Sequence, residues 1–171
     1  MNEAVNSKKV KGRRVLRFES LEQVLAEVEM LEKCEEVRTL GNWSAGQTFS
    51  HLARAMVASI DGFPGSLPWP LRVIGRVIKG RALRSRMRAG FKMPKIIRST
   101  MLPPEQSVAE GAAELREAIG RLGREKKRAP SPLLGELTVD QWEQFHCRHA
   151  ELHLGFLVPG QGALVGSSVK D

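Results

Sequence analysis

Three of the four histidines of this chain lie within eight residues of one another, in a spacing that suits metal binding. His146, His149 and His153 are separated by three and four positions, which corresponds to successive turns of a helix. A helix over 138–158 would turn all three toward its apolar, aromatic face. A buried imidazole nitrogen without a partner costs about 1–3 kcal/mol, and one shared divalent ion would satisfy several of them at once.

Ligand geometry narrows the set that can share one ion. Zinc binds imidazole nitrogen at about 2.0–2.1 Å, so ligand nitrogens lie only about 3 Å apart. His146 and His153 would be separated by about 10.5 Å along a helix, whereas His149 and His153 can chelate together. A third ligand must come from a facing helix, and His51 is the remaining histidine. We therefore expect His51, His149 and His153 (the histidine trio) to bind a divalent ion such as zinc or nickel.

Other residues near the trio have more ordinary interpretations. His146 is expected to be an outer hydrogen-bonding group, a proton carrier or a core residue, and Gln47 to bond a ligand or substrate. The spacing differs from the H-E-x-x-H pattern of zinc proteases, because Glu151 would face away from the ion. Cys147 is predicted to be a packing residue, since neighbours in a helix do not face each other. The histidines could also be structural only, without any metal.

Amphipathic helices are expected to position these side chains. Each of four capping boxes, in which Ser or Thr is followed three residues later by Gln or Glu, predicts a helix start; they are Ser20–Gln23, Ser44–Gln47, Ser107–Glu110 and Thr138–Gln141. The first helix should end near Glu36, the second near Gly62 and the last near Val158. A further helix over 71–87 should carry an apolar stripe made of Leu71, Ile74, Val77 and Ile78. With almost no strand signal, the expected class is all-α, a helix bundle.

The net charge of +8 is concentrated in one segment of the chain. Ten basic residues and no acidic residue lie between Arg72 and Arg98. Beside a metal pocket this segment would attract a small anionic substrate; the candidate anion-binding residues are Arg84, Arg88, Lys92 and Lys95. The alternative is a non-catalytic module that binds nucleic acid or an anionic membrane surface through 72–98. Phe91 is its only aromatic residue, which argues against base stacking.

The chain is expected to form one domain. Residues 15–159 would be the helical domain, 1–14 a flexible basic arm and 160–171 a flexible tail. No run approaches the roughly 20 apolar residues that span a bilayer, so no transmembrane segment is expected. Two cysteines make no disulfide framework, which indicates a cytoplasmic protein. The apolar loop at 67–71 leaves a homodimer open.

Several segments resemble known families. The run 41–47 leading into His51, and the run from Trp142 through His149-Ala-Glu-Leu-His153, resemble the second and last helices of the DinB-like superfamily. Segments at 12–21, 61–64 and 90–95 resemble, more narrowly, domain-of-unknown-function family 1569. Together the resemblance covers about residues 10–159.

The resemblance has consequences for fold and function. It implies an up-and-down-type four-helix bundle, here with the extra basic helix and loop between helices two and three. It implies a metal ion held by the histidine trio, the same residues that geometry selects. DinB-like proteins include metal-dependent hydrolases and S-transferases that use small thiols such as bacillithiol or mycothiol, so the expected function is one of these, acting on a small molecule.

Overall fold

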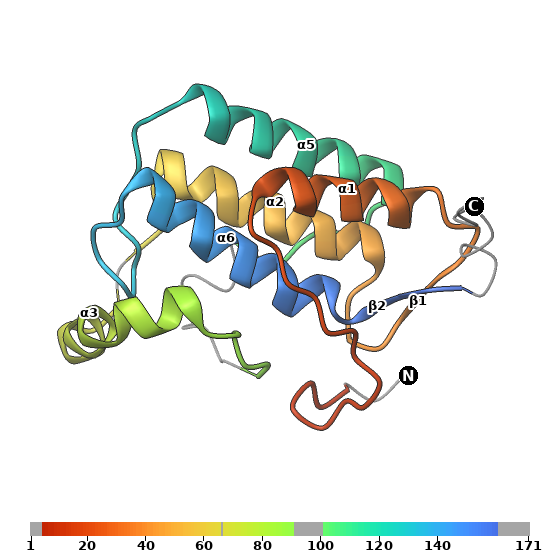
Figure 1. The fold of residues 1–171 in the computed structure, drawn as a ribbon, viewed down its shortest axis with the longest axis horizontal. Helices are drawn as coiled ribbons and strands as arrows, with labels where there is room; N and C mark the ends of the chain where they lie inside the picture. Colours follow the sequence, from red (N-terminus) through yellow and green to blue (C-terminus); the bar gives the residue numbers. More distant parts are fainter. Residues whose placement is uncertain (1–4, 66, 91–100, 161–171) are drawn as a thin grey trace, which may run out of the picture.

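The computed structural model describes residues 5–65, 67–90 and 101–160. These ranges contain five helices and one two-stranded sheet, so the chain is mostly helical, as predicted. The elements are α1 (Leu21–Glu32), β1 (Val37–Thr39), α2 (Ala45–Asp61), α3 (Trp69–Arg84), α5 (Val108–Arg124), α6 (Val139–Leu154) and β2 (Leu157–Pro159). The helices α1, α2, α5 and α6 pack on one another (Figure 1). Helix α3 lies at the side of this group and contacts α6. The tail at 161–171 and residues 1–4 of the arm lie outside the described residues.

All four predicted helix starts are confirmed, because Ser20, Ser44, Ser107 and Thr138 are the N-cap residues, but the bonds of the capping box form in three cases of four. Side-chain and backbone bonds of a full capping box are present at Ser44, Ser107 and Thr138. The box predicted at Ser20 is wrong: its side chain makes no capping bond, and Gln23 accepts instead from the backbone N–H of Glu19 at 2.8 Å. The Ser20 hydroxyl is used by the Glu22 carboxylate, whose pKa it lowers.

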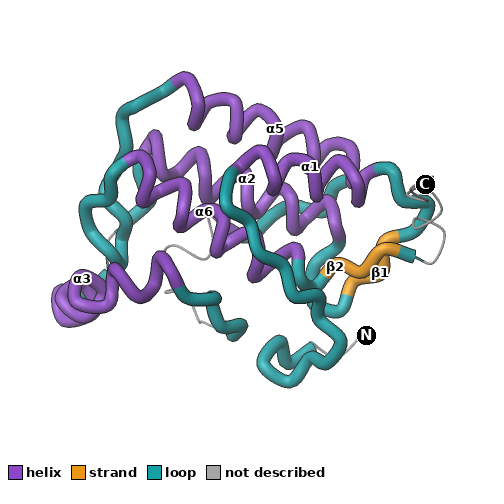
Figure 2. The backbone as a smooth tube through the Cα atoms, viewed as in Figure 1, coloured by secondary structure: helices purple, strands orange, loops and turns teal. Residues whose placement is uncertain are grey.

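Two predicted helix ends are also wrong, for one shared reason. α1 ends at Glu32 and α6 ends at Leu154, each four residues before the expected end. β1 begins five residues after the end of α1 and β2 begins three residues after the end of α6, and the two strands pair antiparallel with Thr39 opposite Leu157. Figure 2 shows this short ribbon beyond the helix ends. Three-residue strands carry too little periodicity to be recognised, and pairing between distant segments overrides local helix propensity.

The main core lies between α1, α2, α5 and α6. α2 is the most enclosed of these helices, with thirteen buried residues along its seventeen. Fully buried side chains from all four helices meet there; among them are Phe49, Leu52, Met56, Val24, Val28, Leu31, Leu115 and Leu154. Because α2 is held on several sides, a side chain on its inner face has a fixed position, and His51 is on that face.

The apolar stripe predicted for the basic helix is not buried. Gly75 and Leu83 are the buried residues of α3. A Cβ atom at Gly75 would lie 2.0 Å from the carbonyl oxygen of Leu133, so the absence of a side chain lets α3 press closely against the 131–137 loop. The helix therefore docks through the side that carries Gly75 and Leu83, and the apolar side chains of the predicted stripe face outward.

The segment before α1 is attached to the end of the last helix. Arg14 donates its backbone N–H to Gly155 O at 2.9 Å and its Nε to Leu157 O at 2.6 Å. Arg13 donates to Leu152 O at 2.8 Å. These two residues, assigned from sequence to a loose arm, thus lie against α6 and β2. Within the described ranges, no helix combines the length and the apolar character that a bilayer-spanning segment needs.

Candidate metal centre

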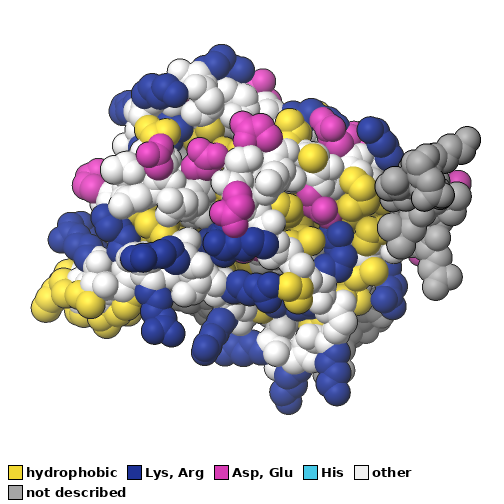
Figure 3. Space-filling model, viewed as in Figure 1, with side chains coloured by type: hydrophobic (Ala, Val, Ile, Leu, Met, Phe, Trp, Pro, Cys, Tyr) yellow, Lys and Arg dark blue, Asp and Glu magenta, His cyan; other side chains and the backbone are white. Residues whose placement is uncertain are grey.

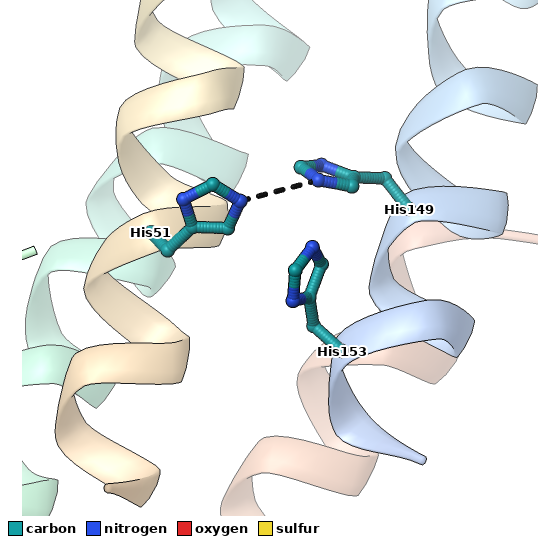
Figure 4. A group of neighbouring side chains, drawn as sticks. All are labelled: His51, His149 and His153. Carbon is teal, nitrogen blue, oxygen red and sulfur yellow. Dashed lines mark hydrogen bonds between the residues drawn. The ribbon is translucent and has the colours of Figure 1, made fainter. Parts of the chain in front are cut away.

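The structure brings the histidine trio together between two helices. His51 comes from α2, and His149 and His153 come from adjacent turns of α6 (Figure 4). One ring nitrogen from each residue lies within 4.8 Å of the others. The ring of His153 is centred 4.6 Å from that of His51 and 4.7 Å from that of His149. This group of nitrogens could hold a metal ion.

The spacing of two of these nitrogens matches two ligands of one ion. His51 Nε2 and His149 Nε2 are 3.3 Å apart. Metal–nitrogen bonds of about 2.0–2.1 Å at a tetrahedral angle place ligand nitrogens roughly 3.3–3.4 Å apart. The same pair also meets the distance limit of a direct hydrogen bond, although N–H donors prefer about 2.9–3.0 Å. Both arrangements require a lone pair on at least one of the two nitrogens.

A backbone carbonyl fixes that lone pair on His51. His51 Nδ1 lies 2.9 Å from Met101 O. A carbonyl oxygen only accepts hydrogen bonds, so Nδ1 carries the proton and Nε2 presents its lone pair to His149 and His153. Metal-binding histidines are commonly oriented by such a bond from the other ring nitrogen. His149 differs, because its buried Nδ1 has no hydrogen-bond partner in the part of the chain described.

Two aromatic side chains enclose the trio. The Trp43 ring stacks on His153 with centroids 5.5 Å apart and planes at 17°, and it lies 4.7 Å from His51. On the other side, the Phe145 ring is 5.9 Å from His149. Sequence reasoning gave Trp43 no role of its own. Its position directly before the Ser44 helix cap, two turns ahead of His51, is the signal that could have identified it.

The environment keeps the three imidazoles neutral. Burial lowers the pKa of His51, against the opposing effect of the bond to Met101. Burial, and then the neighbouring histidines, hold the pKa of His149 well below its usual value, and burial followed by His51 does the same for His153. Neutral imidazole is the form that binds metal. His51 is buried, and His149 and His153 are partly buried.

Other predicted residues near the trio have structural roles. The Gln47 side-chain oxygen accepts from Ser44 N at 3.0 Å, so it completes the helix cap. Cys147 is a core residue, and burial raises the pKa of its thiol to about 12, as suits a packing residue. Glu151 Oε1 accepts from Phe18 N at 2.7 Å and lies 3.0 Å from the Arg148 guanidinium. It faces the segment before α1, consistent with its exclusion as a general base.

The candidate anion-binding residues are placed only in part. Arg84 and Arg88 are exposed. Arg84 Nε donates to Gly80 O at 3.1 Å within α3. Lys92 and Lys95 lie outside the described residues. Within the described residues, no hydrogen bond or ion pair joins Arg84 or Arg88 to the histidine trio.

His146 occupies a separate position one turn before the trio. Ser59 donates its hydroxyl to Met56 O at 2.6 Å, so its oxygen must accept from His146 Nε2 at 3.0 Å. The imidazole is fully buried, and it stacks on Trp142 with centroids 5.2 Å apart. Its Nδ1 is therefore an unprotonated acceptor, with no partner among the described residues. Of the three interpretations offered by the sequence, this arrangement favours the core residue.

His146 gives the folded protein a measurable sensitivity to acid. Burial, with Arg128 nearby, lowers its pKa to about 3, whereas an unfolded chain protonates histidine near 6.5. Stability present at neutral pH is therefore lost as the pH falls from about 6.5 toward 3, because the unfolded state binds the proton first. Between pH 7.5 and 5.5 the free energy of unfolding should fall by about 1.4 kcal/mol more in the metal-free wild type than in His146→Gln.

Urea unfolding of both proteins at the two pH values measures this difference. The histidine trio titrates in both proteins, so comparing the two losses isolates His146. Equal losses in the wild type and in the variant would show that His146 can be protonated in the folded state.

Comparison with known proteins gives one match. A family model described as "Protein of unknown function (DUF1569)" matches residues 10–160, which is most of the chain. No curated protein and no solved structure matches it.

Proposed function

The chain belongs to the DUF1569 family, whose function is unknown, and we propose that it binds a divalent metal ion through the histidine trio. The observation that carries this proposal is the approach of His51 Nε2 to His149 Nε2 at 3.3 Å, with the His51 proton held on the opposite nitrogen by Met101 O. An all-imidazole donor set suits zinc or nickel.

The surroundings of the trio indicate what else would bind there. No carboxylate or thiol joins the three imidazoles within the described residues, so the ligands are all neutral. Arg13 and Arg54 add positive charge near His153 and His51. An anionic fourth ligand is therefore favoured electrostatically. A divalent ion in this position acts as a Lewis acid and lowers the pKa of a water molecule or thiol bound to it.

The chain's own residues would provide orientation and partial exclusion of water. The Met101 carbonyl holds the His51 ring, and the Trp43 ring covers one face of His153. Phe145 lies on the side of His149. The two α6 histidines are partly buried, whereas His51 is buried.

We further propose that the packing of α1, α2, α5 and α6 is the up-and-down four-helix bundle of the DinB-like superfamily. The placement of His51 on α2, and of His149 and His153 on the last helix, supports this assignment. The corresponding activities are hydrolysis and S-transfer from a small thiol. Both described cysteines are free, which fits the proposed location in a reducing cytoplasm.

Titration of zinc into the chelator-treated, untagged protein tests the metal site. We expect one equivalent to bind and to raise the melting temperature. Zinc at 100 times its dissociation constant should add about 2.7 kcal/mol to the free energy of unfolding. Cobalt in place of zinc should give visible absorption bands typical of low coordination number. Absence of both the stabilisation and the bands would overturn the proposal.

The two proposed reaction classes are separable in the metal-loaded protein. A hydrolase consumes an activated ester or amide without added thiol. An S-transferase consumes cysteine and an electrophile together, and it does so faster than the metal-free protein. Metal binding without either activity would leave a binding protein, which removes the catalytic part of the proposal and keeps the metal site.

A further inference from the structure

The helix α3 has an exposed apolar face that the metal site does not use. Trp69 is 72 % exposed, Ile74 54 % and Val77 81 %. Leu71, Val73 and Ile78 are exposed with them. At 100° per residue these six side chains occupy one broad arc, opposite the side on which Gly75 and Leu83 are buried. Monomeric proteins rarely leave so many neighbouring apolar side chains in water without a partner.

The helix that carries this apolar face is strongly basic. α3 contains five basic residues and no acidic residue: Arg72, Arg76, Lys79, Arg81 and Arg84. At 100° per residue, Arg81 and Arg84 project on the same side as the arc, at its C-terminal end. Arg72, Arg76 and Lys79 lie toward the docked side, where Arg76 packs against Gly135. Figure 3 shows the exposed hydrophobic cluster at the lower left, with Lys and Arg side chains beside it. The combination predicts a partner that has an anionic surface layer and an apolar interior beneath that layer.

We propose that α3 docks the protein onto an anionic lipid membrane. The apolar arc would enter the boundary between headgroups and acyl chains, as interfacial amphipathic helices do. Trp69 has the amphipathic ring that is favoured at that depth. The arginines would keep their guanidinium groups in the headgroup layer, next to lipid phosphates. The proposal is independent of the metal site.

The attachment of α3 suits a fixed docking surface. Gly75 rests against the backbone of Leu133, and Leu83 packs with Leu134, Leu137 and Trp142. Lys79 Nζ donates to Glu136 O at 3.0 Å on the same side. The helix is therefore held to the body of the protein by one side, and the apolar arc on the other side is presented without rearrangement.

Other partners fit this surface less well. Nucleic acid offers phosphates for the arginines but no apolar surface for Ile74 or Val77, and Trp69 is the only aromatic residue of the helix. A second copy of the chain would place the five basic residues of one α3 against those of the other, which is repulsive. An anionic lipid surface supplies both the apolar region and the negative charge.

Vesicle binding by the full chain tests the proposal. We expect co-sedimentation with phosphatidylcholine vesicles that contain about one third phosphatidylserine, and much less with pure phosphatidylcholine. Binding should weaken as salt is raised. The emission of Trp69 should shift to shorter wavelength on binding, and Trp69→Phe should remove that shift, because Trp142 is already buried and Trp43 is already stacked on His153.

Matched variants locate the contact. Val77→Asp should weaken binding at least tenfold, and the control Val15→Asp should not, although Val15 is also strongly exposed, at 72 %. Arg81→Gln with Arg84→Gln, on the apolar side of the helix, should cost about fivefold per charge. Lys33→Gln with Arg38→Gln changes the net charge equally on exposed residues outside α3 and should have little effect.

Several results would overturn the proposal. These are no binding to the anionic vesicles at low salt, equal binding to both lipids, or equal losses in the α3 variants and their controls. A dimer in solution that Val77→Asp converts to a monomer, without vesicle binding, would identify a second copy as the partner. The measurement is repeated with chelator present, and loss of binding there would show that the surface depends on the metal.

Discussion

Replacing His149 with alanine is expected to lower the affinity for zinc by more than about 100-fold. Loss of a residue that merely orients a ligand typically costs 10- to 100-fold, and loss of a direct ligand should cost more. In the structure, His149 Nε2 is the atom that faces His51 Nε2 at 3.3 Å, and His149 and His153 are the pair on α6 that we propose to chelate the ion together. Removing it leaves two ligands on separate helices.

The affinity is measured by competition with a chelator of known zinc affinity, using folded protein of each kind. His146→Gln is the matched control, because that residue lies on the same helix, is buried, and bonds to Ser59 outside the trio. It should keep the wild-type affinity. A His149→Ala protein that still binds zinc as tightly as the control would remove the trio as the binding site.

The trio could be predicted from sequence because its placement depends on local rules. The spacing of His149 and His153 fixes their relation on any helix, and the Thr138 capping box that starts this helix is confirmed. His51 follows a second confirmed capping box at Ser44. The only assumption about distant segments was that the helix of His51 packs against the helix of His149 and His153. His51 was then the one remaining histidine that could be the third ligand.

Features that depend on contacts between distant segments could not be predicted. The apolar pattern of α3 shows that one face of the helix favours burial. The pattern does not show whether other segments of the same chain pack against that face. The pairing of β1 with β2 joins segments about 120 residues apart, and neither strand is long enough to show a period of two. Met101 O, which fixes the His51 tautomer, comes from a backbone position that no side-chain pattern marks.

The contact between α2 and α5 also joins segments that are distant in the sequence, and a substitution there is expected to change the stability of the protein strongly. Gly111 on α5 faces the backbone of Gly46 on α2, and a Cβ atom at Gly111 would lie 2.4 Å from Gly46 O. A Cβ at Gly46 would in turn lie 2.4 Å from the carbonyl oxygens of Gln106 and Ser107. Backbone atoms cannot rotate away as a side chain can, so any added atom must push the helices apart.

Gly111→Ala is therefore expected to lower the free energy of unfolding by about 2 kcal/mol. Overfilling a packed contact costs about 1–3 kcal/mol, and here the displaced helices carry much of the core. Alanine is the better helix former, which offsets part of this cost. Chemical denaturation of the wild type and the variant measures the difference. Because α2 also carries His51, a weaker affinity for zinc should accompany the loss of stability.

Gly123→Ala is the matched control, since it makes the same chemical change on the same helix with the opposite expected sign. A Cβ at Gly123 would meet nothing within 4 Å. Only the helix-propensity gain remains, so this variant should be more stable than the wild type by roughly 0.5–1 kcal/mol. The two alanine variants should thus differ by about 3 kcal/mol. Equal stability of Gly111→Ala and Gly123→Ala would contradict the close contact between the backbones of α2 and α5. Because His51 is carried by α2, its position would then be in error as well.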